Sequence, residues 1–206
     1  MSIPLFSTKQ RILGAAEELF ARHGFAGASL RQVTSAAQVN LAAVNYHFGS
    51  KENLINEVFR RRLDGLNAQR MTALTAARAR PGYALEDTLD AFVRPALTLA
   101  SNDHGGAAFV RVLARAYAEH NERLRKFLHD NYSHVLKEFA NDFTRFLPHL
   151  DKQELYWRLD IVSGALTYAM ADFGVIKRRG SSEQQHRDLA AQHLIKFAAA
   201  GLKADG

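Results

Sequence analysis

Apolar side chains recur every three or four residues through almost the whole 206-residue chain. This spacing is the period of one face of an α-helix, whereas a half-buried strand alternates residue by residue. No run of alternating β-branched residues stands out, and only four prolines interrupt the helical pattern. The sequence therefore predicts an all-α fold.

The first two predicted helices carry clear end signals. A helix over residues 8–23 is followed by Gly24, which suits the left-handed conformation that often ends a helix. Ser29 and Gln32 have the spacing of a capping box, in which each residue bonds the backbone of the other. They predict the start of a short second helix that ends near Ala37.

A third short helix and a long fourth helix follow directly. Asn40 is a favourable N-cap for a helix over residues 41–48, and Gly49 ends it. Ser50 then caps a helix that continues to about residue 79. The Arg80-Pro81-Gly82 break separates these helices from five more, expected near residues 84–101, 106–119, 121–147, 151–177 and 182–202.

The two sides of the third helix differ in an unusual way. Leu41, Val44 and Phe48 are separated by three and four residues and form the side that we expect to be buried. The other side is small and uncharged, with Ala42, Ala43 and Tyr46 on it and Asn45 and His47 on its flanks. An ordinary solvent-exposed face would carry Lys, Glu or Gln instead.

Two short capped helices joined by a tight turn, the second with a slim face, suit entry into the DNA major groove, which is about 12 Å wide. An alanine methyl can contact a thymine methyl, Asn45 can bond adenine, and Tyr46 or His47 can reach phosphate oxygens. His47 could instead cap the end of its helix. Lys51 adds a cation at a helix N-terminus, which favours phosphate. Arg31 either contacts phosphate or is simply solvated.

Charge and composition agree with a nucleic-acid partner and give little support to an enzyme or a metal-binding protein. Residues 1–66 hold eight Lys or Arg and five Asp or Glu, so their net charge of +3 is half of the chain's +6 in about a third of its length. The absence of cysteine excludes disulfides and thiolate metal sites. The nine histidines form no H-E-x-x-H motif, and neither a G-x-S-x-G motif nor a phosphate-binding glycine loop occurs. We expect no enzymatic activity, no metal and no cofactor.

Residues 1–7 lack the features of a signal peptide, and no apolar run approaches the roughly 18 residues that a membrane span requires. We therefore expect a cytoplasmic protein without a membrane segment.

Residues 12–55, ILGAAEELFARHGFAGASLRQVTSAAQVNLAAVNYHFGSKENLI, resemble the DNA-binding domain of TetR-type transcriptional regulators. The shared signals are the A-A-x-x-L-F helix, the Gly24 stop, the Ser29 cap, and Y-H-F followed by S-K-E. The resemblance implies a helix-turn-helix domain that binds double-stranded operator DNA. The predicted DNA-binding residues are Ser29, Arg31, Asn40, Ala42, Ala43, Asn45, Tyr46, His47 and Lys51.

A second resemblance concerns the effector. NLAAVNYHFGSK, ARAYAE at residues 114–119 and ELYWRLDIVSGALTYAMADFG at residues 154–174 are similar to the fatty-acid-responsive PsrA-like subgroup. This similarity implies a homodimeric repressor that a small apolar effector, of the long-chain fatty acid or acyl thioester class, releases from DNA. The implied domains are a helix-turn-helix domain at 1–50, a connecting helix at 51–80, and a ligand-binding and dimerisation domain at 81–206.

Several expectations for the C-terminal part have open alternatives. Aromatic and apolar side chains in this part are expected to form the core, and a few of them to line a cavity. Arg111 and Arg115 are four residues apart and share a helix face, where they either neutralise a ligand anion or form surface ion pairs. Helices 151–177 and 182–202 pair with their symmetry mates, or they close the core of each protomer. The candidate ligand-binding residues are Phe109, Leu113, Arg115, Tyr117, Trp157 and Tyr168. An alternative function is a helical acyl-binding protein without specific DNA binding.

Overall fold

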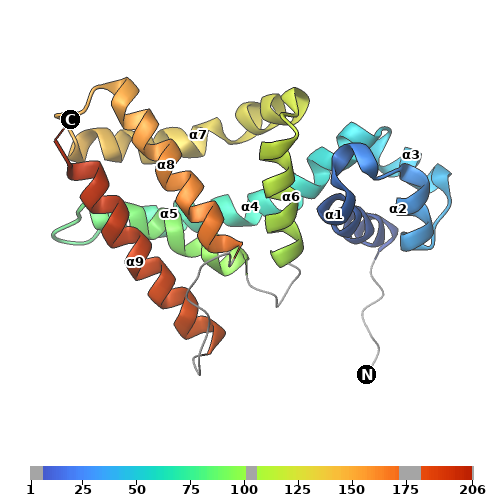
Figure 1. Cartoon of the computed structure of the whole chain (residues 1–206), viewed down its shortest axis with the longest axis horizontal. Helices are drawn as coiled ribbons and strands as arrows, with labels where there is room; N and C mark the ends of the chain where they lie inside the picture. Colours follow the sequence, from blue (N-terminus) through green and yellow to red (C-terminus); the bar gives the residue numbers. More distant parts are fainter. Residues whose placement is uncertain (1–6, 101–105, 172–181, 206) are drawn as a thin grey trace. The chain divides into compact units, whose positions relative to one another are not determined.

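The computed structural model describes residues 7–100, 106–171 and 182–205, and within these ranges the chain forms nine α-helices and no strand (Figure 1). The predicted all-α fold is confirmed. Residues 172–177 of the predicted helix over 151–177 lie outside the described ranges. The helices are α1 (Thr8–Gly27), α2 (Leu30–Ala37), α3 (Leu41–Phe48), α4 (Lys51–Arg78), α5 (Leu85–Leu99), α6 (Gly106–Ala118), α7 (Glu122–Phe146), α8 (Lys152–Met170) and α9 (Glu183–Lys203).

The helices assemble into two compact units, and neither is continuous in sequence. Unit 1 consists of the described residues up to Asp64 together with Ala108–Asp130. Unit 2 consists of the described residues from Gly65 to Ala107 and from Asn131 onward. Helices α4, α6 and α7 therefore contribute to both. These units do not test the predicted division of the chain at residues 50 and 80, which remains a prediction.

The core of unit 1 contains a run of aromatic rings from three helices. Phe20 and Phe25 of α1 have ring centroids 5.5 Å apart, Phe25 lies 6.3 Å from Phe59 of α4, and Phe59 meets Phe109 of α6 edge-on at 5.5 Å. All four side chains are buried. Edge-to-face contacts of this kind stabilise a core beyond the burial of apolar area. The start of α6 is thus part of the same core as α1 and α4.

The predicted helix starts around α2 and α3 are confirmed by their caps. Ser29 Oγ accepts the Gln32 N–H at 3.2 Å, and Gln32 Oε1 accepts the Ser29 N–H at 2.7 Å. Asn40 Oδ1 accepts the Ala43 N–H at 2.9 Å. Gly49 follows α3 with φ of 74°, a conformation that glycine adopts without strain. These local bonds fix both ends of α3.

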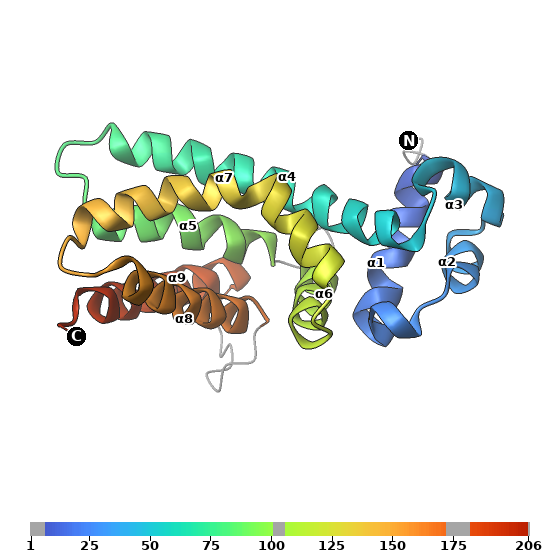
Figure 2. The same ribbon diagram turned by 90° about the horizontal axis from the view of Figure 1, so that it is seen from above.

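In unit 2, α4, α5 and α7 run side by side (Figure 2). Arg70 of α4 lies over the Phe92 ring of α5, 3.9 Å from its centroid, and Phe92 meets Phe139 of α7 at 5.3 Å. Helices α8 and α9 pack on each other and on α5. On α8 the buried side chains include Leu155, Val162 and Leu166. These side chains close the core of the protomer, which is one of the two alternatives for this helix.

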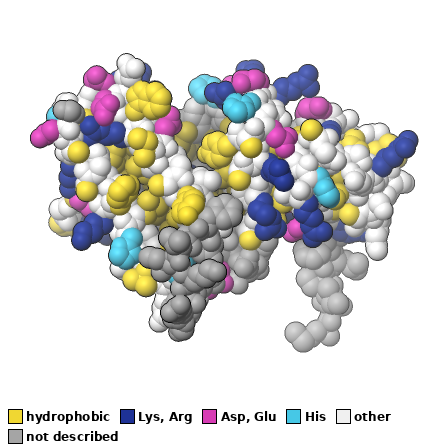
Figure 3. Space-filling view, in the orientation of Figure 1, with side chains coloured by type: hydrophobic (Ala, Val, Ile, Leu, Met, Phe, Trp, Pro, Cys, Tyr) yellow, Lys and Arg dark blue, Asp and Glu magenta, His cyan; other side chains and the backbone are white. Residues whose placement is uncertain are grey.

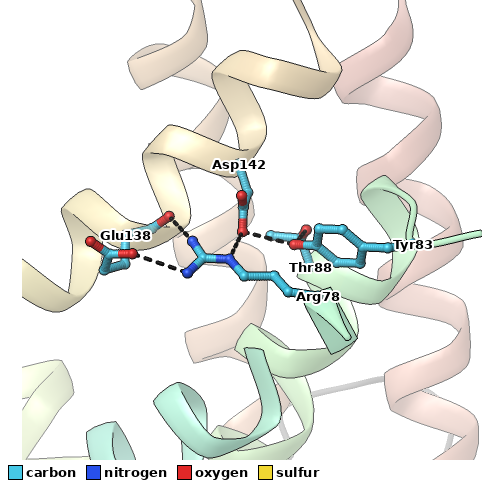
Figure 4. Close-up of polar contacts among 5 residues, drawn as sticks. All are labelled: Arg78, Tyr83, Thr88, Glu138 and Asp142. Carbon is cyan, nitrogen blue, oxygen red and sulfur yellow. Dashed lines mark hydrogen bonds and ion pairs between the residues drawn. The ribbon is translucent and has the colours of Figure 1, made fainter. Parts of the chain in front are cut away.

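A polar cluster joins α4, α5 and α7 beside the turn after α4 (Figure 4). Arg78 Nε donates to Asp142 Oδ2 at 2.8 Å, and Arg78 Nη1 donates to Glu138 at 3.1 Å. The Tyr83 hydroxyl donates to the same Asp142 oxygen at 2.8 Å and lies 2.6 Å from Thr88 Oγ1. Burial raises the pKa of Tyr83, and the bond to Asp142 adds to the rise. The cluster anchors the C-terminal end of α4 within unit 2.

Candidate DNA-binding interface

The turn between α2 and α3 is held from α1. Gln38 ends α2 in the left-handed conformation, with φ of 52° and ψ of 51°. Arg11 Nη2 donates to the carbonyl oxygens of Ala37 and Gln38 at 2.5 and 2.8 Å. These carbonyls end a helix, where a cation is favourable. Arg11 therefore fixes the turn that sets the direction of α3.

Helix α3 is anchored on one side and open on the other. Val44 is fully buried and Phe48 is 5% exposed, whereas Ala42 and Asn45 are exposed and Tyr46 is 85% exposed. The open side thus presents a methyl group, a carboxamide and a phenol without any charge. Burying Tyr46 would have contradicted a DNA-reading role, and the structure places it in the open.

The predicted faces of α3 need correction at Leu41, Ala43 and Asn45. Leu41 was expected on the buried side, but it is 43% exposed. It is the first residue of the helix, and because side chains lean toward the helix N-terminus, Leu41 projects beyond the end of α3. Ala43 and His47 are half-buried, so they flank the open side, of which Ala42, Asn45 and Tyr46 form the centre.

The other predicted contact residues also belong to unit 1. Ser29 and Asn40 are exposed, and their side-chain oxygens already serve as helix caps. Arg31 is exposed in the first turn of α2. Lys51 is half-buried at the start of α4, where Ser50 Oγ accepts the Asn53 N–H at 3.1 Å. The nine predicted residues thus lie at the starts of α2, α3 and α4 and along α3.

His47 has a neighbourhood that the sequence did not indicate. Its ring lies 5.1 Å from that of Tyr46 and 6.0 Å from that of Phe48. Gly49 N–H and Asn53 Nδ2 donate to the last carbonyls of α3, those of Asn45 and Phe48. His47 also lines a polar pocket, together with Lys9, Phe48, Asn53, Asn56, Glu57, Arg60 and Phe127.

Two groups of ion pairs behind α3 were missed by sequence reasoning. Arg62 of α4 binds Glu17 of α1 through Nε and Nη2, at 3.1 and 2.7 Å. Glu57 of α4 pairs with Arg60 and, at 3.0 Å, with Lys9. Burial raises the pKa of Glu57, but Lys9 and Arg60 outweigh burial and bring this pKa below its ordinary value. No sequence motif marks these partners, because Glu17 and Arg62 are 45 positions apart and Lys9 and Glu57 are 48 positions apart.

The six candidate ligand residues are divided between the two units. In unit 1, Phe109 is core, Leu113 is half-buried, Tyr117 is exposed, and Arg115 donates to the Arg22 carbonyl at 3.4 Å. In unit 2, Trp157 and Tyr168 are exposed on α8, by 63% and 53%. Arg111 Nη2 lies 3.9 Å from Glu18, which agrees with the alternative that Arg111 forms a surface ion pair. Ligand binding by these residues remains a prediction.

In the described ranges, no three His, Asp or Glu side chains are grouped so as to hold a metal ion. None of the helices in those ranges combines the length and the apolar character of a bilayer span.

A short capped helix that follows a tight turn and exposes a narrow, uncharged face is the reading element of helix-turn-helix DNA-binding regulators. Two family models match the chain: "Bacterial regulatory proteins, tetR family" over residues 12–58, and "Tetracyclin repressor-like, C-terminal domain" over residues 90–201. The chain belongs to the TetR family of transcription regulators.

The chain is similar to other regulators in its DNA-binding region and in its fold. The HTH-type transcriptional regulatory protein RaaS of Mycobacterium tuberculosis is 57% identical over 44 residues, which is 21% of this chain and 20% of RaaS. A TetR-like regulator from Rhodococcus sp. has the same fold, with a TM-score of 0.65 and 20% identity, over 99% of this chain and 100% of its own. The fatty acid degradation regulator FadR from Bacillus halodurans aligns over 95% of this chain and 96% of its own, with a TM-score of 0.63 and 18% identity.

Proposed function

We propose that this protein is a homodimeric, cytoplasmic transcriptional repressor that binds operator DNA through α3 and that a small apolar effector releases. The observation that carries the proposal is the open side of α3, where Ala42, Asn45 and Tyr46 are exposed while Val44 and Phe48 anchor the helix. A helix that buries one side this fully and leaves the other slim and uncharged is suited to a groove rather than to solvent.

Each side chain has a distinct part in binding. Asn45 reads a base edge, since a carboxamide can form two hydrogen bonds to adenine, and Ala42 contacts a thymine methyl. Tyr46 and His47 bond phosphate oxygens, and Lys51 adds a cation beside the free N–H groups at the start of α4. Ser29, Arg31, Asn40 and Ala43 border the same surface. Phosphate contacts position the protein, and base contacts select the sequence.

The exposed face of α8 supports the homodimer. Figure 3 shows hydrophobic side chains gathered over this helix, and its exposed apolar residues are Tyr156, Trp157, Ile161 and Tyr168, joined on α9 by Leu189 and Phe197. Exposed apolar surface of this extent marks an interface, and a second copy gives the protein two reading helices. Two such helices can span half-sites about 34 to 36 Å apart.

The effector class is inferred from likeness rather than from a bound molecule. The sequence is similar to the fatty-acid-responsive subgroup, and a protein of the same fold is named as a fatty acid degradation regulator. An apolar effector would favour the dimer in which the reading helices no longer match the half-sites. It shifts this equilibrium only by its difference in affinity for the two states. Helix α4, which belongs to both units, carries the change.

A gel-shift titration tests the proposal, using purified protein and a duplex that the protein itself selects from a random pool. Saturable binding that oleoyl-CoA abolishes supports an acyl-responsive repressor. Binding that oleoyl-CoA leaves intact supports the DNA-binding role and rejects this effector class. Binding of oleoyl-CoA without affinity for any duplex supports the helical acyl-binding protein instead.

A further inference from the structure

The end of α6 reaches back to the first helix of the DNA-binding unit. Glu119, the residue after α6, accepts the Phe25 N–H through both carboxylate oxygens, at 3.0 and 3.1 Å. These two residues are 94 positions apart, and both belong to unit 1. The contact lies where α1 is interrupted: Gly24 has φ of 72° and ψ of 176°, so that a new helical turn begins at Phe25.

The charges around this interruption are matched to the backbone on both sides. The last carbonyls before a break carry partial negative charge, and the first N–H groups after it carry partial positive charge. Arg115, one turn earlier on α6, donates to the Arg22 carbonyl at 3.4 Å on the first side. Glu119 accepts the Phe25 N–H, which is one of the first N–H groups after the break. Each side chain thus meets a backbone group of the opposite sign.

Gly24 is suited to this arrangement in two ways. Its positive φ is unfavourable for other residues. A Cβ at this position would also overlap the Glu119 carboxylate, because the carboxylate lies where that side chain would begin. Any larger residue would therefore displace Glu119 from Phe25.

The same segment is packed into the core behind the DNA-reading helices. Phe25 contacts Phe20 and Phe59, and Phe59 contacts Phe109 of α6. Earlier in α1, Arg11 holds the turn before α3. Helix α1 thus carries the Glu119 contact at one end and the support of the reading helix at the other.

We propose that Glu119 is a positioning residue for DNA recognition: its carboxylate fixes the α1 interruption and, through α1, the placement of α3. This role rests on the proposed DNA-binding function, although the contact itself is testable without DNA. Glu119 does not touch DNA in this proposal; it acts only through α1.

Amide hydrogen exchange tests the contact. In Glu119→Ala, the Phe25 amide should exchange about tenfold faster, as expected for the loss of a hydrogen bond to a charged group. The Val33 amide, which bonds the Ser29 carbonyl at 3.1 Å in the same unit, should be unchanged. The matched control is Glu122→Ala, which removes an exposed glutamate that pairs with Arg125 within α7. Unchanged exchange at Phe25 would show that Glu119 does not hold the α1 break.

DNA affinity tests the positioning role on a duplex that the wild type selects from a random pool. Well below its melting temperature, Glu119→Ala should bind about fivefold more weakly, with the same salt dependence as the wild type because no phosphate contact is lost. Glu119→Gln should stay within about twofold of the wild type, since an amide oxygen accepts the same N–H. If Glu119→Ala is less stable but binds this duplex like the wild type, Glu119 is merely structural.

A double variant separates these outcomes further, and Gly24→Ala alone serves if Glu119→Ala folds poorly. Gly24→Ala displaces Glu119, so Gly24→Ala and Gly24→Ala/Glu119→Ala should bind the duplex equally. Additive losses would overturn the coupling of the two residues. If the wild type binds no duplex at all, the proposed DNA-binding function fails, whereas the exchange result at Phe25 still decides whether the contact exists.

Discussion

Arg62 of α4 and Glu17 of α1 form a bidentate ion pair inside unit 1, with side-chain exposures of 12% and 4%. Both oxygens of the carboxylate are bonded, at 3.1 and 2.7 Å. Two charges removed from water in this way depend on each other, because either one alone would be left buried without a partner. The pair ties the unit 1 part of α4 to α1.

Removing one partner should therefore destabilise the protein strongly. We expect Glu17→Ala to lower the free energy of unfolding by about 3 kcal/mol, measured by urea denaturation. The control is Glu18→Ala, since Glu18 is the exposed neighbour and its pairs with Arg22 and Arg111 are long, at 3.7 and 3.9 Å. Glu18→Ala should change stability by less than about 0.5 kcal/mol. Equal effects of the two variants would refute a special role of the buried pair.

Lys51 and Asn45 should affect DNA binding in different ways. Lys51→Ala should weaken binding to all duplexes and reduce the slope of log K against log salt by about one, because one phosphate contact is lost. Asn45→Ala should instead change the preference among duplexes that differ at single base pairs. Fluorescence anisotropy at several salt concentrations measures both. A uniform loss on every duplex would reject Asn45 as a base-reading residue.

Two substitutions of Asn40 should separate effects on stability from effects on DNA binding. In Asn40→Asp the carboxylate can still cap α3, and its charge suits a helix N-terminus, so the thermal midpoint should be maintained. The new charge would face the phosphates, so DNA affinity should fall severalfold. Asn40→Ala loses the cap and should cost about 1 kcal/mol of stability. If Asn40→Asp binds DNA as well as the wild type, Asn40 lies away from the phosphates.

Glu57 should contribute to the acid sensitivity of unit 1. Its pKa in the folded state is lowered from the ordinary 4.5 by Lys9 and Arg60, in spite of burial. The stabilising effect is present above about pH 4.5 and is lost as the pH falls through the lowered pKa. Glu57→Gln should therefore lose less stability than the wild type between about pH 5 and 3. Urea titrations at each pH measure this, and Glu52→Gln, an exposed glutamate of α4, is the control.

Ile161 tests the proposed dimer. Its side chain is 64% exposed on α8, so Ile161→Glu should fold normally but place a charge in the dimer interface. We expect a shift from dimer to monomer in analytical ultracentrifugation and a loss of tight operator binding. Leu136→Glu, at a 55% exposed position on α7, should remain dimeric. An unchanged mass for Ile161→Glu would place the interface elsewhere.

The sequence predicted best what local bonds determine. The caps at Ser29, Asn40 and Ser50 and the glycine at position 49 follow from interactions within a few residues, and the structure confirms them. The combination of a buried Val44 with an exposed Tyr46 likewise follows from helical periodicity.

Prediction failed where residues distant in sequence meet or where a helix ends. Leu41 fits the periodicity of the buried side, but its place in the first turn leaves it exposed. Glu17, Glu57 and Glu119 resemble ordinary surface glutamates, and only the folded chain brings their partners to them. Aromatic character alone placed Trp157 and Tyr168 among the core and ligand-binding candidates, but they fall outside the helical spacing of the buried Leu155, Val162 and Leu166, and both are exposed.

The assembly of unit 1 from two separate segments has a consequence during synthesis. When residue 64 has left the ribosome, the helix-turn-helix sequence is present, but Phe59 still lacks the Phe109 ring and Phe25 lacks the Glu119 carboxylate. Both arrive only with residues 108–130, after more than half of the chain has been translated. A nascent chain therefore cannot complete the core of this unit before α6 and the beginning of α7 have emerged.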